Sequence, residues 1–177
     1  MNYRKTVICV AGMCLMTVPL LARHADGHGR PERDFRAALA GRNEVPVTLS
    51  AASGTLSLTV NDDDTSVHFV LTYGGFLTPV GAAHIHVAQK NVNGGVTVFF
   101  CGGGGRPACP PQGTVEGDFT ANDVIGLATQ QLEPNNLQKL LAAIRAGTTY
   151  ANVHTTTSPG GEIRGQIHDD DKHDKKD

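Results

Sequence analysis

The chain has 177 residues, which suits one domain, and its 15 Lys and Arg against 17 Asp and Glu give a formal net charge of −2 at pH 7. No basic run interleaved with aromatic residues occurs anywhere in the sequence. Because a nucleic-acid-binding surface needs a concentration of positive charge, these features argue against a nucleic-acid partner.

The N-terminal segment has the pattern of a secretory signal peptide. Arg4 and Lys5 precede the apolar run "VICVAGMCLMTVPLLA", which ends at Ala22. The run has 16 residues, fewer than the roughly 20 that a membrane-spanning helix needs, although an uncleaved N-terminal anchor is the alternative. We therefore predict a signal peptide over residues 1–22 with cleavage near residues 22–25, and a secreted or periplasmic protein with no membrane span after cleavage.

Two polar segments flank the predicted domain. Residues 23–33 are polar, contain Gly and Pro and show no periodicity, so we expect a flexible lead-in. Residues 169–177 carry mixed charge, and we expect a disordered tail. The flanks carry His24, His28 and His173, which we interpret as solvated surface histidines. The domain itself is expected over residues 34–168.

Short segments with period-two alternation occupy most of the domain. "GTLSLTV" places Leu56, Leu58 and Val60 on one face, and the turn "NDDDT" connects it to "SVHFVLTY", so the two predict a hairpin. "AAHIHVA" and "GVTVFF" predict a second pair around "QKNVNG". Four further segments are "DFRAAL", "GTVEGDF", "TTYANVHT" and "GEIRGQI". This spacing predicts a mainly β protein, an antiparallel β-sandwich or barrel.

One segment departs from this pattern. "PNNLQKLLAAIRAG" has apolar residues at helical spacing, with Pro134 near its start and Gly147 just past its end. Before it, Thr120 and Asp123 have the spacing of a capping box. We predict a helical insertion near residues 121–146, before the last two strands, with its apolar stripe packed on a sheet edge or barrel mouth.

The cysteines indicate one disulfide bond. Cys9 and Cys14 would leave with the signal peptide, so that Cys101 and Cys109 remain in "CGGGGRPACPP". A single pair in an exported protein predicts a disulfide. The alternative is a two-thiol metal site, but zinc–thiolate sites usually draw four ligands from paired motifs, and no second pair is present.

Two histidines, His84 and His86, lie one residue apart in "GAAHIHVAQKNVNGG". Residues i and i+2 of a strand point to the same face, about 6.6–6.8 Å apart along the chain, so both imidazoles can approach one ion. His154, in "YANVHT", is the candidate third ligand, and His68 and Glu162 are weaker additions. Neutral imidazoles suit copper and zinc, so the hypothesis is a three-histidine site for copper first and zinc second.

A structural role for these histidines is the alternative hypothesis. A buried imidazole can bond a backbone carbonyl or a carboxylate across a sheet. Glu162 and Arg164 share one face of "GEIRG" and are candidates for a hydrogen-bonded network around the histidines, or for a second shell around a metal. The sequence contains no GxSxG elbow, Walker loop or dinucleotide fingerprint, which favours a non-catalytic protein.

Five separated motifs agree with one known family in order and spacing. They are "FRAALAGRNEVPV", "GTLSLTV", "AAHIHVA", "YANVHT" and "GEIRGQI". Together they resemble the CHRD domain, the module repeated in chordin and found singly in bacterial exported proteins. The resemblance implies a Greek-key β-sandwich that is either immunoglobulin-like or similar to copper–zinc superoxide dismutase. The "HIH" strand is similar to the copper-ligand strand of that enzyme.

The resemblance also bears on function. Chordin sequesters extracellular growth factors, so the family implies a non-catalytic extracellular or periplasmic binding or structural module. The partner is then an unknown extracellular protein or a metal ion. The alternative function is a metal-binding β-sandwich that uses the three histidines. Dismutase activity is disfavoured because the zinc-loop ligands are missing.

Overall fold

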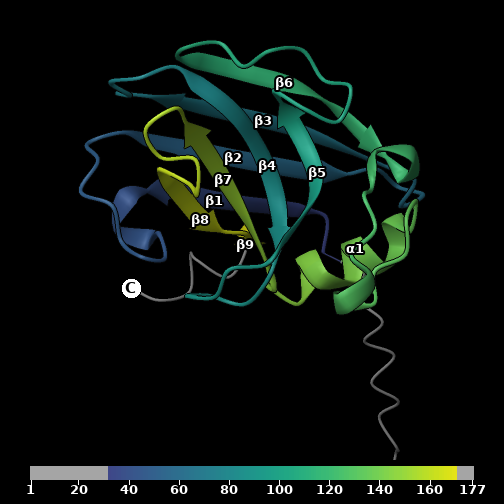
Figure 1. Cartoon of the computed structure of the whole chain (residues 1–177). Coiled ribbons are helices and arrows are strands. Elements are labelled where there is room, and N and C mark those ends of the chain that lie inside the picture. Colours follow the sequence, from purple (N-terminus) through teal and green to yellow (C-terminus); the bar gives the residue numbers. More distant parts are fainter. Residues whose placement is uncertain (1–31, 171–177) are drawn as a thin grey trace, which may run out of the picture. The chain divides into compact units, whose positions relative to one another are not determined.

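The computed structural model describes residues 32–170, and this part of the chain is mainly antiparallel β-structure (Figure 1). In chain order the strands are β1 (Asp34–Ala40), β2 (Ser53–Val60), β3 (Ser66–Gly74), β4 (Val80–Val87), β5 (Gly95–Cys101), β6 (Gly113–Thr120), β7 (Thr149–Thr155), β8 (Ile163–Gln166) and β9 (His168–Asp169). One α-helix, α1 (Leu137–Arg145), lies between β6 and β7. Within residues 32–170, no helix is long and apolar enough to cross a membrane.

The predictions for the two ends of the chain lie almost wholly outside the described residues. These are the signal peptide over residues 1–22, the lead-in over residues 23–33 except its last two residues, and the tail over residues 169–177 except its first two. Of those tail residues, Asp169 pairs with Phe35 of β1 within β9, so the regular structure extends one residue beyond the expected boundary at residue 168.

The eight predicted strand segments coincide with β1 to β8 and are confirmed. In β2 the apolar residues are buried and the Ser and Thr residues between them are exposed. The β2–β3 hairpin aligns Leu56 with Leu71 and Val60 with Val67, so the apolar faces of both strands cover one core. The alternation therefore reports a real inner and outer face, which is why it located the strands.

The strands form one hydrogen-bonded sheet in the order β5-β4-β7-β8-β1-β2-β3-β6, with β9 paired to β1. The sheet curls until its edge strands β5 and β6 approach each other, so it is nearly closed into a barrel (Figure 1). The expected Greek-key sandwich is not confirmed, because the strands follow a single continuous path. Curling buries the apolar face within one sheet, in place of packing two separate sheets together.

The helical insertion is shorter than predicted. Only α1 is an α-helix, while two 3₁₀ turns, Ala121–Asp123 and Ala128–Gln130, occupy the earlier part of the predicted range 121–146. Gln131 and Asn135 have left-handed backbones (φ 57° and 62°), which interrupt helical propagation between the turns and α1.

The predicted capping and stripe of this insertion are present. The Asp123 carboxylate accepts hydrogen bonds from the backbone N–H of Thr120 (2.8 Å) and from its hydroxyl (3.2 Å). In α1 the apolar stripe is buried in the core; its members are Leu137, Leu140, Leu141 and Ile144. The stripe therefore closes one end of the core, as the helical spacing indicated.

The predicted disulfide between Cys101 and Cys109 is present in the structure. Cys101 ends β5, and the glycine-rich segment turns back through Gly102, Gly104 and Gly105, all of which have positive φ. Because these backbone conformations are strained for residues with a Cβ, the glycines allow the tight return that brings the two sulfurs together.

The central residues of β4, residues 83–86, and nearly all of β7 are buried on both faces. Ala83, Ile85, Ala151 and Val153 face the apolar core and are wholly inaccessible. The opposite face carries polar side chains, and the loops that follow β1 and β4 lie over it. Asn93 joins these two loops, since its amide donates to the Val45 carbonyl oxygen (3.0 Å). The sheet thus has a polar, covered face, which positions the candidate site.

Candidate metal centre

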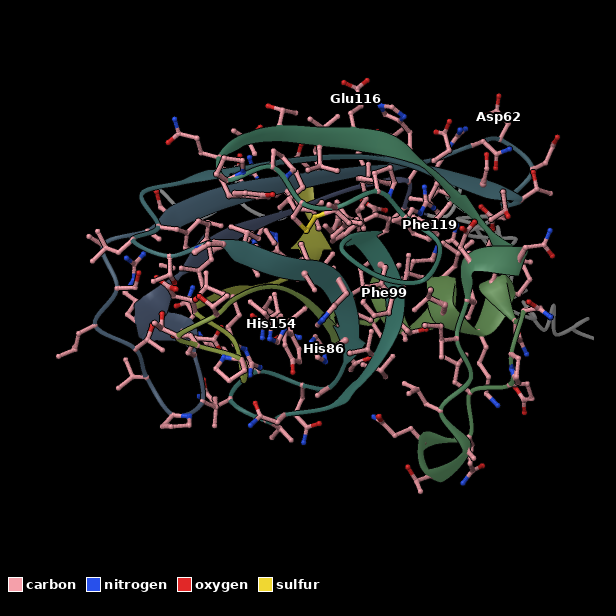
Figure 2. All side chains as sticks on the ribbon, turned by 45° about the horizontal axis from the view of Figure 1, so that its top comes forward. Asp62, His86, Phe99, Glu116, Phe119 and His154 are labelled. Atoms are coloured by element: carbon pink, nitrogen blue, oxygen red, sulfur yellow. A yellow bond between two sulfur atoms is a disulfide. The ribbon has the colours of Figure 1, made fainter. Side chains whose placement is uncertain are left out.

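The register of β4 and β7 brings the three predicted histidines together. His154 lies opposite Ala82, and His84 lies opposite Asn152, so the three imidazoles project from the same face of neighbouring strands. The ring centroid of His84 is 4.6 Å from that of His86 and 4.4 Å from that of His154, and the His86 and His154 centroids are 5.9 Å apart. Figure 2 shows His86 and His154 close to each other on this face.

Each imidazole offers one nitrogen to a common space. Three ring nitrogens, one each from His84, His86 and His154, lie within 4.8 Å of one another. The buried nitrogens Nδ1 of His84, Nε2 of His86 and Nε2 of His154 have no hydrogen-bond partner. A buried polar atom without a partner is costly, so these three nitrogens make the cluster a candidate site for a ligand that accepts nitrogen lone pairs.

Backbone carbonyls hold two of the rings from behind. Nδ1 of His86 lies 2.9 Å from the Gly94 oxygen, and Nδ1 of His154 lies 3.0 Å from the Pro159 oxygen. A carbonyl can only accept, so each Nδ1 carries the proton and each Nε2 keeps its lone pair. Metal-binding histidines are oriented in this way in proteins.

Burial keeps these imidazoles uncharged. Desolvation lowers the pKa of His84 to about 2, with smaller contributions from His154 and His86. Desolvation lowers the pKa of His86 to about 4, although its bond to Gly94 opposes the shift. Burial also lowers the pKa of the half-buried His154. All three rings are therefore neutral near pH 7, which is the form that binds metals.

Aromatic side chains fix the ring positions further. The His86 ring stacks on Tyr150, and Phe99 packs edge-on against His84 with centroids 4.9 Å apart. The Arg164 guanidinium carbon lies 3.6 Å from the centroid of the same Tyr150 ring. Arg164, Tyr150 and His86 thus form a stacked column that limits how far the His86 ring can move.

The two predicted second-shell residues lie on this face but bond elsewhere. The Glu162 carboxylate accepts hydrogen bonds from the hydroxyls of Ser50 (2.6 Å) and Thr155 (2.5 Å). The Arg164 guanidinium donates to the Asn93 side-chain oxygen (3.0 Å) and to the Val92 carbonyl oxygen (2.9 Å). Neither residue forms a hydrogen bond with the three histidines in the described part of the chain.

His68, a weaker candidate from the sequence, is not part of the cluster. It lies on β3, it is exposed, and its imidazole faces Asp118 (2.9 Å) and Glu116 (3.4 Å) of β6. The alternation of β3 places this side chain on the outer surface of the sheet, so this sequence interpretation was wrong.

Glu44 and Asn152 were missed by the sequence analysis. Both are buried, and Glu44 Oε1 and Asn152 Oδ1 have no hydrogen-bond partner. A Cβ built on Gly161 would lie 2.7 Å from each of these two oxygens, so both face the same small space beside this glycine. Desolvation raises the pKa of Glu44 to about 7, and the positive charge of Arg164 opposes that shift. Asn152 lies two residues before His154 on the same strand, so the period-two pattern could have placed its side chain on the same face. Glu44 lies in an irregular loop, where no periodic pattern indicates its position.

The three imidazoles are candidate ligands for a divalent or monovalent d-block ion. Zn–N and Cu–N bonds of about 2.0–2.1 Å around a tetrahedral ion place nitrogens about 3.3 Å apart. The three nitrogens here lie within 4.8 Å of one another, so the rings would have to move closer together to reach that spacing. The cluster lacks a thiolate, because the cysteines of the described chain are joined in the disulfide.

The fold and this cluster define a mainly β-domain with a covered polar face that carries three neutral imidazoles. The family model of the CHRD domain matches residues 35–167. The match covers nearly all of the described residues, and the chain belongs to the CHRD domain family. A comparison with curated proteins found no match.

Proposed function

We propose that this protein is an exported, non-catalytic CHRD module that binds one transition-metal ion, copper first and zinc second, through His84, His86 and His154. The observation that carries the proposal is that one nitrogen from each of the three rings lies within 4.8 Å of the others, and that each ring has a buried nitrogen with no hydrogen-bond partner. Two of the rings are anchored by carbonyls on their other nitrogen. A purely structural network would be expected to use both nitrogens of each buried ring.

The chemistry of the donors supports copper over zinc. Imidazole binds both ions, and the general affinity order places Cu²⁺ above Zn²⁺ for the same nitrogen ligands. Structural zinc sites usually have four protein ligands, and only three ligating side chains converge here among residues 32–170. A three-nitrogen site with an apolar wall formed by Phe99 and Tyr150 suits copper better.

Export is supported by two independent features. The structure contains the Cys101–Cys109 disulfide. Disulfides persist in oxidising compartments and are rare in cytosolic proteins. The N-terminal sequence has the pattern of a secretory signal peptide. We propose a secreted or periplasmic location on these grounds.

The CHRD family supports a binding or structural role in place of catalysis, since chordin repeats belong to a protein that sequesters others. An extracellular protein is therefore a second candidate partner, and it is compatible with a bound metal ion. Glu162 and Arg164 then support the loops around the site, since their bonds reach Ser50, Thr155, Val92 and Asn93.

The decisive experiment measures metal bound to the purified protein. The protein is stripped of metal, loaded with Cu²⁺ or Zn²⁺ and dialysed against a weak chelator. Elemental mass spectrometry then measures the number of metal ions bound per chain. To remove competing histidines, the starting protein carries His24→Ala, His28→Ala and His173→Ala. We expect about one ion per chain, since the three ligands surround one space.

The histidine variants then identify the ligands. His84→Ala, His86→Ala and His154→Ala should each lower the affinity at least tenfold, because two imidazoles cannot hold the ion in a preferred geometry. His68→Ala is the matched control, since this exposed histidine lies outside the cluster and its loss should leave binding unchanged. Two results together would instead show that the cluster is structural. The protein with its terminal histidines would bind metal whether or not the cluster histidines are replaced, and the protein without its terminal histidines would bind none.

A further inference from the structure

A second polar site lies on the same side of the sheet, beside Arg164. A cavity of about 360 Å³ is bounded by residues from β1, β8, β9 and the loops after β1 and β4. Its lining consists of Ala38, Asn43, Lys90, Asn91, Arg164, Gln166 and His168. A volume of this size accommodates a small organic ligand.

The lining combines basic groups with amides. Lys90, Arg164 and His168 are basic, Asn43, Asn91 and Gln166 carry amides, and none of the lining residues is acidic. The chain as a whole carries a formal net charge of −2. The cavity therefore concentrates positive charge and hydrogen-bond donors on a protein that is otherwise slightly acidic, a local reversal that attracts anions.

Arg164 is a buried cation that forms no ion pair with a carboxylate in the part of the chain that the structure describes. It is 2% exposed, and within residues 32–170 its guanidinium donates only to two neutral acceptors, the Asn93 amide oxygen and the Val92 carbonyl oxygen. Other buried or half-buried arginines of the described chain have carboxylate partners: Arg33 pairs with Asp62, and Arg145 pairs with Asp64.

The groups near Arg164 compensate its charge only in part. Tyr150 provides a cation–π contact, with the guanidinium carbon 3.6 Å from the ring centroid. Glu44 is the acidic group whose charge Arg164 influences, but burial raises the pKa of Glu44 to about 7, so its negative charge is incomplete at neutral pH. A buried guanidinium with this much uncompensated charge is costly unless an anion approaches it.

Lys90 supplies the accessible charge of the cavity. It is exposed and forms no ion pair in the described part of the chain, in contrast to Lys139, which pairs with Glu133 at 3.1 Å. The side chain of Gln166 uses its amide nitrogen for the carbonyls of Ala88 and Gly147. Gln166 is thereby held in place as a rigid part of the cavity wall.

We infer that this cavity binds a small oxyanion, a carboxylate or phosphate group, between Lys90 and Arg164. The guanidinium is held in a fixed orientation by Asn93, Val92 and Tyr150, as planar recognition of an oxyanion requires. The amides of Asn43 and Asn91 line the same cavity and offer further hydrogen bonds. The site is separate from the three-histidine cluster, since none of the three histidines lines the cavity.

The test uses the metal-free protein, so its outcome does not depend on metal binding. The protein is stripped with a chelator, desalted, labelled with ¹⁵N and titrated separately with sodium phosphate and sodium succinate at low ionic strength. Sodium chloride at matched ionic strength is the control for screening. We expect saturable shifts of the amide signals of Asn43, Asn91 and Gln166, and the stronger of the two anions identifies the ligand class.

Two lysine variants, each of which removes one positive charge, complete the design. Lys90→Gln should weaken binding about fivefold or more, because it removes a charge-assisted contact from an exposed side chain without disturbing the core. Lys139→Gln removes the same charge on α1 and should leave the affinity unchanged. The inference is overturned by shifts that chloride reproduces, by the absence of saturable shifts with both anions, or by equal affinities of wild type and Lys90→Gln.

Discussion

The imidazole of His86 lies flat against the phenol ring of Tyr150, with centroids 4.6 Å apart and ring planes within 3°. The Tyr150 hydroxyl also accepts a hydrogen bond from the backbone N–H of Gly94 (3.3 Å), whose carbonyl oxygen contacts Nδ1 of His86. Tyr150 therefore holds His86 twice, through its ring and through the loop that follows β4. The orientation of one candidate ligand nitrogen, Nε2 of His86, therefore depends on a residue outside the histidine cluster.

Replacing Tyr150 should weaken metal binding without removing a ligand. Tyr150→Leu loses both the ring stack and the hydroxyl acceptor, so we expect the affinity for copper to fall about tenfold or more, as is usual for residues that orient ligands. Tyr150→Phe keeps the stack and should retain most of the affinity, with about 1 kcal/mol lost from folding stability. Competition against a chelator of known affinity measures the first quantity, and urea unfolding measures the second. Equal affinities of the Leu variant and the wild type would contradict the role of the stack.

The metal-free protein should lose stability as the solution is acidified. The pKa values of His84 and His86 are lowered to about 2 and about 4 in the folded state, whereas unfolded histidines have a pKa near 6.5. As the pH falls, the unfolded chain therefore binds protons before the folded chain does. The free energy of unfolding has its full value above about pH 6.5 and decreases as the pH drops toward 4. Each group contributes at most about 1.4 kcal/mol per pH unit in this window.

Urea unfolding between pH 8 and pH 5 measures this slope. His84→Gln should have a shallower slope than the wild type, because glutamine does not titrate. His68→Gln, which alters an exposed histidine, is the matched control and should keep the wild-type slope. A wild-type slope that is retained by His84→Gln would show that burial of His84 does not drive the acid sensitivity.

Glu44 should have the opposite effect on stability. Its pKa is raised to about 7 in the folded state from the ordinary value of 4.5, because burial disfavours the carboxylate. The folded state therefore holds the proton more tightly, and this stabilisation is complete below about pH 4.5 and is lost as the pH rises through 7. Glu44→Gln mimics the protonated form, so we expect it to gain stability over the wild type at pH 8, by about 1–2 kcal/mol after solvent screening.

The comparison of Glu44→Gln with the wild type must be made at two pH values. At pH 5 the wild-type side chain is mostly protonated, so the advantage of the variant should largely disappear. Because the histidine contributions are common to both proteins, they cancel in the difference. A variant that is less stable than the wild type at pH 8 would indicate that the Glu44 carboxylate makes a favourable charged contact with Arg164.

Cys101 and Cys109 should be oxidised to a disulfide in the purified protein, and the bond should stabilise the fold. Mass measurement under denaturing conditions, with alkylation before and after reduction, should find these two thiols blocked until reductant is added. Cys101→Ser with Cys109→Ser should cost about 2–3 kcal/mol, from the entropy of the short loop that the bond closes. Two alkylated thiols without reduction would show that the bond does not form.

The local features of the sequence located the strands β1 to β8 and the helix α1. Leu56, Leu58 and Val60 alternate with polar residues because β2 has one buried face, and this signal is contained within the strand itself. The apolar stripe of α1 was readable for the same reason. The excess length predicted for the insertion arose because the capping-box spacing of Thr120 and Asp123 also occurs at the start of a 3₁₀ turn. The left-handed backbones at Gln131 and Asn135 cannot be recognised from apolar periodicity.

The sequence by itself determined that His84 and His86 point to the same face, because a strand has a period of two. Only the tertiary structure decided that His154 joins them, since that depends on β7 pairing with β4 in one register. The same is true of Glu44, which reaches the polar face through an irregular loop, and of the single curled sheet, which depends on strand order. Strand pairing and loop placement minimise the free energy of the whole chain, so no short segment contains the information that specifies them.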